Sequence, residues 1–298
     1  MSEAAKGAGA MVLACVIWGL SPIYYKLLAH IPPLEILAHR TLWSVLFFAL
    51  VLTAQGRLGM LRRALSSGRD ALVVGIAALM ISANWLTFIT SIQIDRAIEA
   101  SMGYYTFPLA SVLFGALFFR ERLSRAQWVA VALAALAVVT LAAGLGVAPW
   151  LALVIATTFG LYGVAKKFLT VGPVVSVTAE VLMLSPIAIV ILWQVHASGG
   201  GSFGQGMADS LLLAFSGILT AGPLILFSYA TKRMMLSTIG LLQYINPTLQ
   251  FLVATLLFQE LFTPWHAVAF ALIWTALVLY TTASLRQERA SRRLPPSP

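Results

Sequence analysis

Long apolar stretches follow one another along almost the whole chain, separated by short segments that carry charges, glycines or prolines. Each stretch holds about 20 residues, which as a helix crosses the roughly 30 Å hydrocarbon core of a bilayer. Backbone groups in lipid must be satisfied internally, and period-two alternation is absent, so helices are expected rather than an outer-membrane barrel. The pattern predicts an all-α membrane protein with ten transmembrane helices, at 8–28, 34–54, 71–92, 98–119, 124–143, 148–167, 174–195, 210–231, 238–258 and 264–284.

Composition agrees with the pattern and excludes other classes. Hydrophobic residues make up 60% of the chain and charged residues 10%, whereas about a quarter of the residues are charged in soluble proteins. Cys15 is the one cysteine, so neither a disulfide framework nor a metal cluster is expected. No cofactor is indicated.

The net charge of +9 follows the loops, as a topology signal does, and does not indicate a nucleic-acid partner. If the N-terminus is cytoplasmic, sixteen of the 19 cations fall on the inside: Lys6, Arg57, Arg62, Arg63, Arg69, Arg120, Arg122, Arg125, Lys166, Lys167, Lys232, Arg233, Arg286, Arg289, Arg292 and Arg293. Only Arg96 falls in an outside loop, while Lys26 and Arg40 lie in or at the ends of spans. This asymmetry predicts a multi-pass membrane protein with both termini cytoplasmic.

The two halves of the chain resemble each other. Tyr105-Thr106-Phe107-Pro108, followed by Glu121, recurs 139 residues later as Tyr244-Ile245-Asn246-Pro247, followed by Glu260. Gly19 and Lys26 similarly match Gly160 and Lys167 at a shift of 141 residues. Five spans per half is an odd number, so the halves enter the membrane from opposite sides and form an inverted repeat, which in transporters places the substrate site near the midplane.

Several motifs, in this order and spacing, carry a family resemblance. They are Ile17-Trp18-Gly19-Leu20-Ser21-Pro22 through Tyr25-Lys26, Glu35-Ile36-Leu37-Ala38-His39-Arg40 with Trp43-Ser44, Asn84-Trp85, Glu99-Ala100-Ser101-x-Gly103-Tyr104, and Gln243-Tyr244-Ile245-x-Pro247-Thr248. Over nearly its whole length the chain resembles the RarD family, in the EamA group of the drug/metabolite transporter superfamily.

The resemblance implies two EamA-like repeats, at 1–146 and 147–285, a location in a bacterial inner membrane, and permease activity. Residues 286–298, basic and then proline-rich, are expected to form a disordered cytoplasmic tail. The family carries a label linked to chloramphenicol sensitivity or resistance, and by analogy the direction is efflux. The expected function is alternating-access transport of a small metabolite or drug-like molecule, amino-acid-like or an amphenicol. Phe107 departs from the pattern, since Asn is expected before the proline by analogy with Asn246.

Neutral polar and aromatic residues within the spans are the candidates for the substrate pocket. Aromatic walls with a few polar groups are typical of small-molecule sites, and Pro108 and Pro247 are expected to free backbone carbonyls. Ordinary interhelical packing is the alternative for any single residue. The predicted binding residues are Trp18, Tyr25, Asn84, Trp85, Ser101, Tyr104, Tyr105, Gln243, Tyr244 and Asn246.

Four ionisable residues are the candidates for gating or coupling, because charges within spans need a partner, water or a function. Lys26 either snorkels to the headgroups or lines an outer vestibule that attracts anions. His39 either pairs with Glu35, four residues away on one helix face, or carries a proton. Arg40 stays charged, so it binds a carboxylate or locks a gate. Glu180 either forms a salt bridge with Lys166 or Lys167, or takes part in gating.

Other classes of function fit less well. An enzyme would need a nucleophile–base pair or a metal-ligand spacing, and the sequence shows neither. A receptor or assembly protein without transport is the alternative hypothesis, but it would be expected to carry a larger soluble domain. A lipid flippase would need a lateral opening. The expected partners are a small-molecule substrate, the lipid bilayer and protons.

Overall fold

The computed structural model describes residues 2–120, 123–146, 149–234 and 236–291, and every regular element in these ranges is a helix. The elements are α1 (Glu3–Leu27), α2 (Pro33–Ala54), α3 (Leu58–Ala64), α4 (Gly68–Gln93), α5 (Ala97–Phe119), α6 (Arg125–Leu145), α7 (Trp150–Lys167), α8 (Pro173–Ala197), α9 (Met207–Thr231), α10 (Leu236–Leu242), α11 (Ile245–Leu252), the π-helical turn η1 (Val253–Leu257) and α12 (Pro264–Ser291).

The helices begin where local sequence satisfies the free N–H groups of a first turn. The Ser2 and Ser67 hydroxyls accept hydrogen bonds from the backbone at the starts of α1 and α4. Ser124 forms a capping box with Gln127 at the start of α6, and α2 and α8 begin with a proline, whose missing N–H has no partner to lose there.

Nine segments of the described chain are long and apolar enough to cross a membrane, and their ranges follow nine of the predicted spans. The remaining predicted span, 148–167, forms α7, an 18-residue helix that ends in two lysines and is not among the nine. Large apolar side chains such as Leu117 (69% exposed), Trp193 (70%) and Leu256 (73%) point outward, as expected in lipid and unlike a soluble surface. The chain is a multi-pass membrane protein.

Three details differ from the predicted elements. The short helix α3 lies in a segment expected to be a loop. The predicted span 238–258 is divided into α10, α11 and η1. Helix α12 continues to Ser291, so residues 286–291, expected to begin a disordered tail, are helical, and residues 292–298 lie outside the described ranges.

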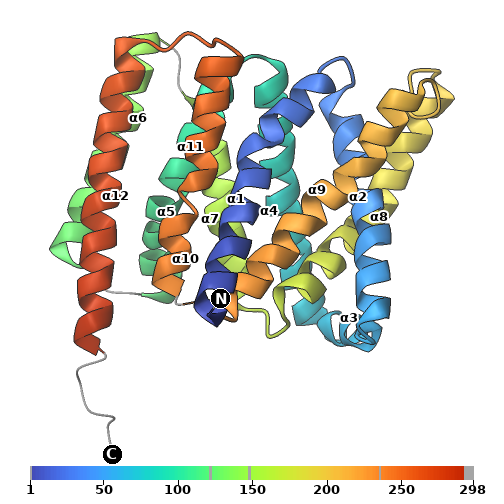
Figure 1. The fold of residues 1–298 in the computed structure, drawn as a ribbon, viewed down its shortest axis with the longest axis horizontal. Coiled ribbons are helices and arrows are strands. Elements are labelled where there is room, and N and C mark those ends of the chain that lie inside the picture. The colour runs from blue at the N-terminus through green and yellow to red at the C-terminus, as the bar shows by residue number, and fades with distance from the viewer. Residues whose placement is uncertain (1, 121–122, 147–148, 235, 292–298) are drawn as a thin grey trace, which may run out of the picture.

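The long helices stand side by side, with α6 and α12 at one edge and α2, α8 and α9 at the other (Figure 1). The start of α1 and the end of α12 lie at the same end of the molecule, the lower end in this view. Helices of the first half pack mainly on helices of the second: α1 on α9 and α11, α2 on α8 and α9, α4 and α5 on α7, and α6 on α12.

Two glycines that match in the repeat lie at equivalent helix contacts. A Cβ atom on Gly19 of α1 would come within 2.6 Å of Leu249 Cβ on α11. A Cβ atom on Gly160 of α7 would come within 2.9 Å of the Phe114 ring on α5. Small residues allow such close approach of helices in membranes, so each half uses its glycine to seat a helix on the other half.

Candidate functional site

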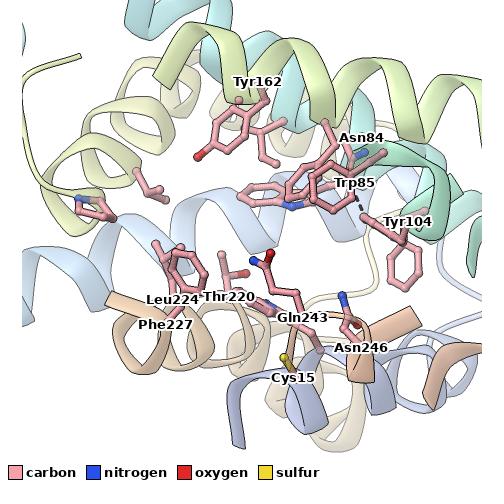
Figure 2. A pocket seen from close by; sticks show the side chains of 18 of the residues that line it. Cys15, Asn84, Trp85, Tyr104, Tyr162, Thr220, Leu224, Phe227, Gln243 and Asn246 are labelled. Atoms are coloured by element: carbon pink, nitrogen blue, oxygen red, sulfur yellow. Dashed lines mark hydrogen bonds between the residues drawn. The ribbon is translucent and has the colours of Figure 1, made fainter. Parts of the chain in front are cut away.

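A cavity of about 500 Å³ lies between the helices and is lined by residues of both halves. The structure brings eight of the ten predicted binding residues to it: Trp18, Tyr25, Asn84, Trp85, Tyr104, Gln243, Tyr244 and Asn246. Figure 2 shows Asn84, Trp85, Tyr104 and Tyr162 on one side of the space, and Thr220, Gln243 and Asn246 on the other. Its volume lies within the range of pockets for small molecules.

Gln243, Tyr244 and Asn246 reach the cavity because the helix is interrupted between α10 and α11. Pro247 has no N–H for the Gln243 carbonyl, and the Asn246 N–H bonds that carbonyl instead, at 3.1 Å. The Leu242 carbonyl is thereby released and accepts from the Cys15 thiol at 3.4 Å. Pro247 therefore frees backbone groups as predicted, whereas α5 continues without a break through Pro108.

Asn84 fixes one wall of the cavity. Its side-chain amide donates to the Ile155 carbonyl at 3.0 Å and to the Thr158 hydroxyl at 3.1 Å, both on α7. Its oxygen accepts from the Tyr104 hydroxyl of α5 at 2.8 Å. Asn84 is fully buried, so these bonds satisfy the whole amide and hold α4, α5 and α7 in register.

Arg40 of α2 lines the cavity and is buried. Its Nε donates to the Thr220 hydroxyl of α9 at 2.8 Å, and its Nη1 donates to the Tyr25 hydroxyl of α1 at 2.5 Å. The guanidinium lies 4.0 Å from the centre of the Trp85 indole on α4. A cation on an aromatic face at this distance is stabilised by the ring quadrupole, so three helices fix the position of this side chain.

Lys166 also lines the cavity, and it forms an ion pair with Glu180 of α8. Glu180 is fully buried and also accepts hydrogen bonds from the Ser176 hydroxyl at 2.8 Å and the Tyr162 hydroxyl at 3.1 Å. The salt bridge predicted for Glu180 is therefore present. Lys166 itself belongs to the last turn of α7, at the end of the predicted span 148–167.

Two predicted binding residues do not line this cavity. The Ser101 hydroxyl donates to the Ile98 carbonyl within its own helix, at 2.7 Å, and the side chain is fully buried. The Tyr105 hydroxyl shares a hydrogen bond with Thr248 at 2.6 Å, and its ring stacks on Tyr244 at 6.4 Å. Tyr105 thus joins α5 to α11, which is the packing alternative for polar residues in spans, whereas the Ser101 bond stays within α5.

Two of the predicted gating residues, His39 and Lys26, lie away from the cavity lining. His39 stacks on Phe203 at 5.1 Å, and its Nε2 has no hydrogen-bond partner within the described ranges. Lys26 forms an ion pair with Asp95, with 32% of its side chain exposed. Lys26 lies in the last turn of α1, so its snorkelling and vestibule roles both remain predictions.

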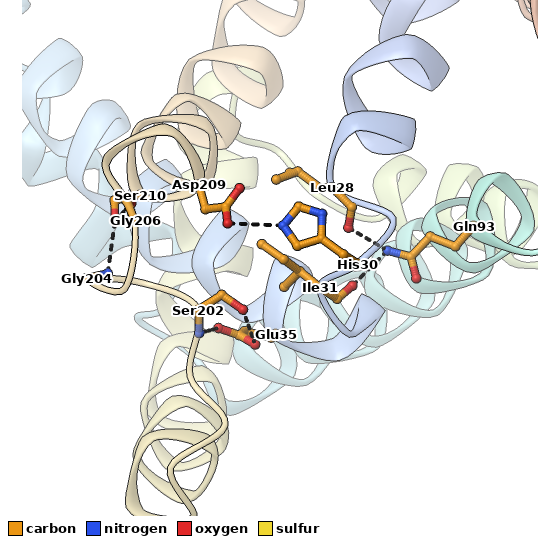
Figure 3. Close-up of polar contacts among 10 residues, drawn as sticks. All are labelled: Leu28, His30, Ile31, Glu35, Gln93, Ser202, Gly204, Gly206, Asp209 and Ser210. Carbon is orange, nitrogen blue, oxygen red and sulfur yellow. Dashed lines mark hydrogen bonds and ion pairs between the residues drawn. The ribbon is translucent and has the colours of Figure 1, made fainter.

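The predicted Glu35–His39 pair is wrong. The Glu35 carboxylate accepts from the Ser202 backbone N–H at 2.7 Å and from its hydroxyl at 3.4 Å (Figure 3). The same figure shows His30 beside Asp209, at 3.0 Å, and the Gln93 amide on the carbonyls of Leu28 and Ile31. The loop between α8 and α9 thus supplies the partner of Glu35, because its N–H groups have no helical acceptor of their own.

Two other carboxylates cap helices from a distance. The Glu99 carboxylate accepts from the Leu151 N–H at 2.9 Å at the start of α7. Glu260 accepts from the N–H groups of Ala97 and Ile98, at 2.6 and 2.8 Å, at the start of α5. Negative charge is favourable at a helix N-terminus. Burial raises the pKa of Glu260, and these two hydrogen bonds oppose the shift. Glu121, its partner in the repeat, lies outside the described residues.

Several lining residues were not among the predicted ones. They include Lys166, Thr220, Tyr162, Phe159, Phe107 and Phe227. Phe107, which stands where Asn was expected, packs edge-on against Phe159 at 4.8 Å. Its departure from the repeat was the one available signal, since an aromatic residue in an apolar run is otherwise typical of packing.

Comparison with known proteins agrees with this architecture. A model of the EamA-like transporter family matches residues 5–143. Protein RarD of Streptomyces exfoliatus is 43% identical over 278 residues, covering 93% of this chain and 88% of that protein. The uncharacterized transporter YojE of Bacillus subtilis is 39% identical over 295 residues, covering 98% of each.

A solved structure described as a crystal structure of protein resembles the fold with a TM-score of 0.62. The match covers 95% of this chain and 99% of that one, at 21% sequence identity. At this identity the likeness concerns the fold alone.

Proposed function

The chain belongs to the RarD family of EamA-type permeases, and we propose that it moves a small organic molecule across the bacterial inner membrane by alternating access. The cavity shared by the two halves is the binding site in this proposal. That shared lining is the observation that carries it, because a site between two halves opens to either side when the halves rock.

The two halves act as inverted five-helix repeats, with α1, α2, α4, α5 and α6 in the first and α7, α8, α9, α10–η1 and α12 in the second. Three observations support this arrangement. Matching pairs of helices pack on each other, as α1 does on α11 and α7 on α5. The matched glycines Gly19 and Gly160 lie at those two contacts. The start of α1 and the end of α12 also lie at the same end of the molecule, as two repeats of five spans each require (Figure 1).

The group formed by Lys166, Glu180 and Tyr162 is the gate that we propose for one end of the cavity. Its members come from α7 and α8, so movement of one helix against the other separates the charges. The cation count of the loops supports a cytoplasmic position of this end. Glu180 is the proposed carrier if transport is coupled to protons. Within the described ranges, no hydrogen bond or ion pair joins the side chain of His39 or Lys26 to a lining residue.

Transport by the purified protein tests the proposal. Proteoliposomes are loaded with a mixed pool that includes aromatic amino acids and an amphenicol, and efflux is followed with and without a pH gradient. We expect selective loss of one class of molecule. Trp85→Ala is expected to slow the loss severalfold, because Trp85 lines the cavity, and Trp128→Ala serves as the matched control, since Trp128 is 54% exposed on α6.

The outcomes separate the alternatives. Acceleration by the gradient supports coupling, and indifference to it supports facilitated diffusion. If folded protein releases no molecule from the pool, a receptor or assembly protein without transport becomes the better account. If transport is seen but Trp85→Ala and Trp128→Ala behave alike, the cavity is not the transport site.

A further inference from the structure

The charges around the cavity do not balance. Arg40 and Lys166 are the two side chains of full charge that line it within the described ranges, and no Asp or Glu is among the lining residues. Lys166 is neutralised by Glu180. No carboxylate of the described residues lies within ion-pair distance of Arg40, so the cavity holds one positive charge without a counter-charge.

An uncompensated buried cation is costly, and buried charges in proteins are ordinarily paired. A guanidinium has five N–H donors in a planar fork. The Arg40 group uses one on Thr220 and one on Tyr25, and its Nη2 donates to no group in the described part of the chain. Donors therefore remain for an acceptor that the protein itself does not supply.

The position of the remaining donors is fixed in advance. Thr220, Tyr25 and the face of Trp85 hold the guanidinium from α9, α1 and α4. A fork fixed in this way loses little conformational entropy when it binds a carboxylate through two parallel hydrogen bonds. A buried arginine without a ligand would not need its free donors fixed in position.

The rest of the lining is largely apolar and includes many aromatic rings. Trp18, Phe88, Phe107, Phe159 and Phe227 line the cavity together with Tyr104. Aromatic and apolar walls favour a substrate with an apolar or aromatic body, and a volume of about 500 Å³ limits that body to the size of a small metabolite.

We infer that the substrate is a small monocarboxylate with an aromatic or apolar body, bound with its carboxylate on Arg40. This inference rests on the proposed function, because it assigns the substrate class of the same cavity. A single negative charge matches the single uncompensated cation. A neutral drug or a dianionic phosphate leaves the cavity charge unbalanced.

Binding of a matched pair of probes tests the inference. Purified full-length protein in lipid nanodiscs is titrated calorimetrically with 3-phenylpropionate, with its neutral amide 3-phenylpropionamide, and with inorganic phosphate. We expect the acid to bind at least about tenfold more tightly than the amide, as a charge-assisted bidentate contact allows. Phosphate is expected to bind more weakly than the acid.

Variants assign the preference to Arg40. Arg40→Gln is expected to remove the advantage of the acid over the amide, and Arg40→Lys to retain part of it, since lysine keeps the charge but not the fork. Arg69→Gln is the matched control, because Arg69 is exposed on α4 outside the cavity lining. The Arg40→Lys variant keeps the test decisive if Arg40→Gln does not fold.

The inference is overturned if wild-type protein binds the acid no better than the amide, if phosphate binds more tightly than the acid, or if the preference survives in Arg40→Gln. Equilibrium binding does not require transport. Acid binding without any flux in proteoliposomes therefore refutes the proposed function but not the inference. Selective flux of neutral solutes alone refutes the inference but not the proposed function.

Discussion

Arg40 and Lys166 both bring a positive charge to the cavity, but only Lys166 has a counter-charge from the protein. Lys166 is paired with Glu180, and the Ser176 and Tyr162 hydroxyls complete the group. Arg40 is held by a threonine, a tyrosine and an indole face, all neutral. The comparison shows that burial of a cation has two different outcomes here: a closed ion pair that joins two helices, and an open charge that faces a binding space.

The largest expected effect concerns the closed pair. Lys166→Met leaves the fully buried Glu180 carboxylate without its partner and is expected to lower the free energy of unfolding by about 3–5 kcal/mol. The double variant Lys166→Met/Glu180→Gln is expected to recover most of that loss, because it removes both charges.

Cys15 provides the measurement for this pair. It is the one cysteine of the chain and is fully buried, so its labelling by a thiol-reactive dye during a titration with denaturing detergent reports unfolding. If the double variant is as unstable as Lys166→Met, the pair is not what stabilises this end of the cavity.

A smaller effect is expected from the support of Arg40. Tyr25→Phe removes the acceptor of the Nη1 hydrogen bond, and a bond of this kind to a charged group contributes about 2 kcal/mol. We expect reduced stability together with weaker binding of 3-phenylpropionate. Tyr24→Phe is the control, because the Tyr24 hydroxyl donates to the Leu212 carbonyl and does not touch Arg40. Equal loss of binding in both variants would contradict a specific role for Tyr25.

The smallest effect concerns the glycines that seat the helices carrying these contacts. Gly19→Ala pushes a Cβ atom against Leu249 Cβ and, at 3.1 Å, the Asn246 carbonyl, and is expected to cost about 1–2 kcal/mol. Gly160→Ala meets the Phe114 ring and is expected to cost less, because a side chain can shift. Gly9 has open space around its Cβ position, so Gly9→Ala is the neutral control in the same labelling assay.

The same comparison extends to the two matched proline segments. Pro108 leaves α5 continuous, whereas Pro247 stands in the first turn of α11 after a break that exposes Gln243 and Tyr244. In each segment a proline follows a tyrosine by three residues, so local sequence alone predicts the same effect of the proline on both helices. The difference depends on the neighbouring helix, since the Cys15 thiol of α1 donates a hydrogen bond to the Leu242 carbonyl that the break releases.

The sequence by itself determined the helices, the approximate ends of the spans and a polar and aromatic part of the cavity lining. Apolar runs of membrane length must be helical because lipid offers no hydrogen-bond partners. Polar residues such as Asn84 and Arg40 within those runs must face the interior for the same reason. Eight of the ten predicted binding residues therefore reach one cavity.

Only the tertiary structure decided which polar group meets which partner. A helix sequence fixes the angular spacing of its side chains but not the rotation of the helix against its neighbours, so Ser101 and Tyr105 bond to helix groups beside the cavity. Glu35 finds its partner in Ser202, 167 residues away, and not in His39 on its own helix. The same long-range packing surrounds Arg40 with neutral partners and leaves it without a counter-charge in the described ranges, because the positions of charges relative to one another depend on all the helices at once.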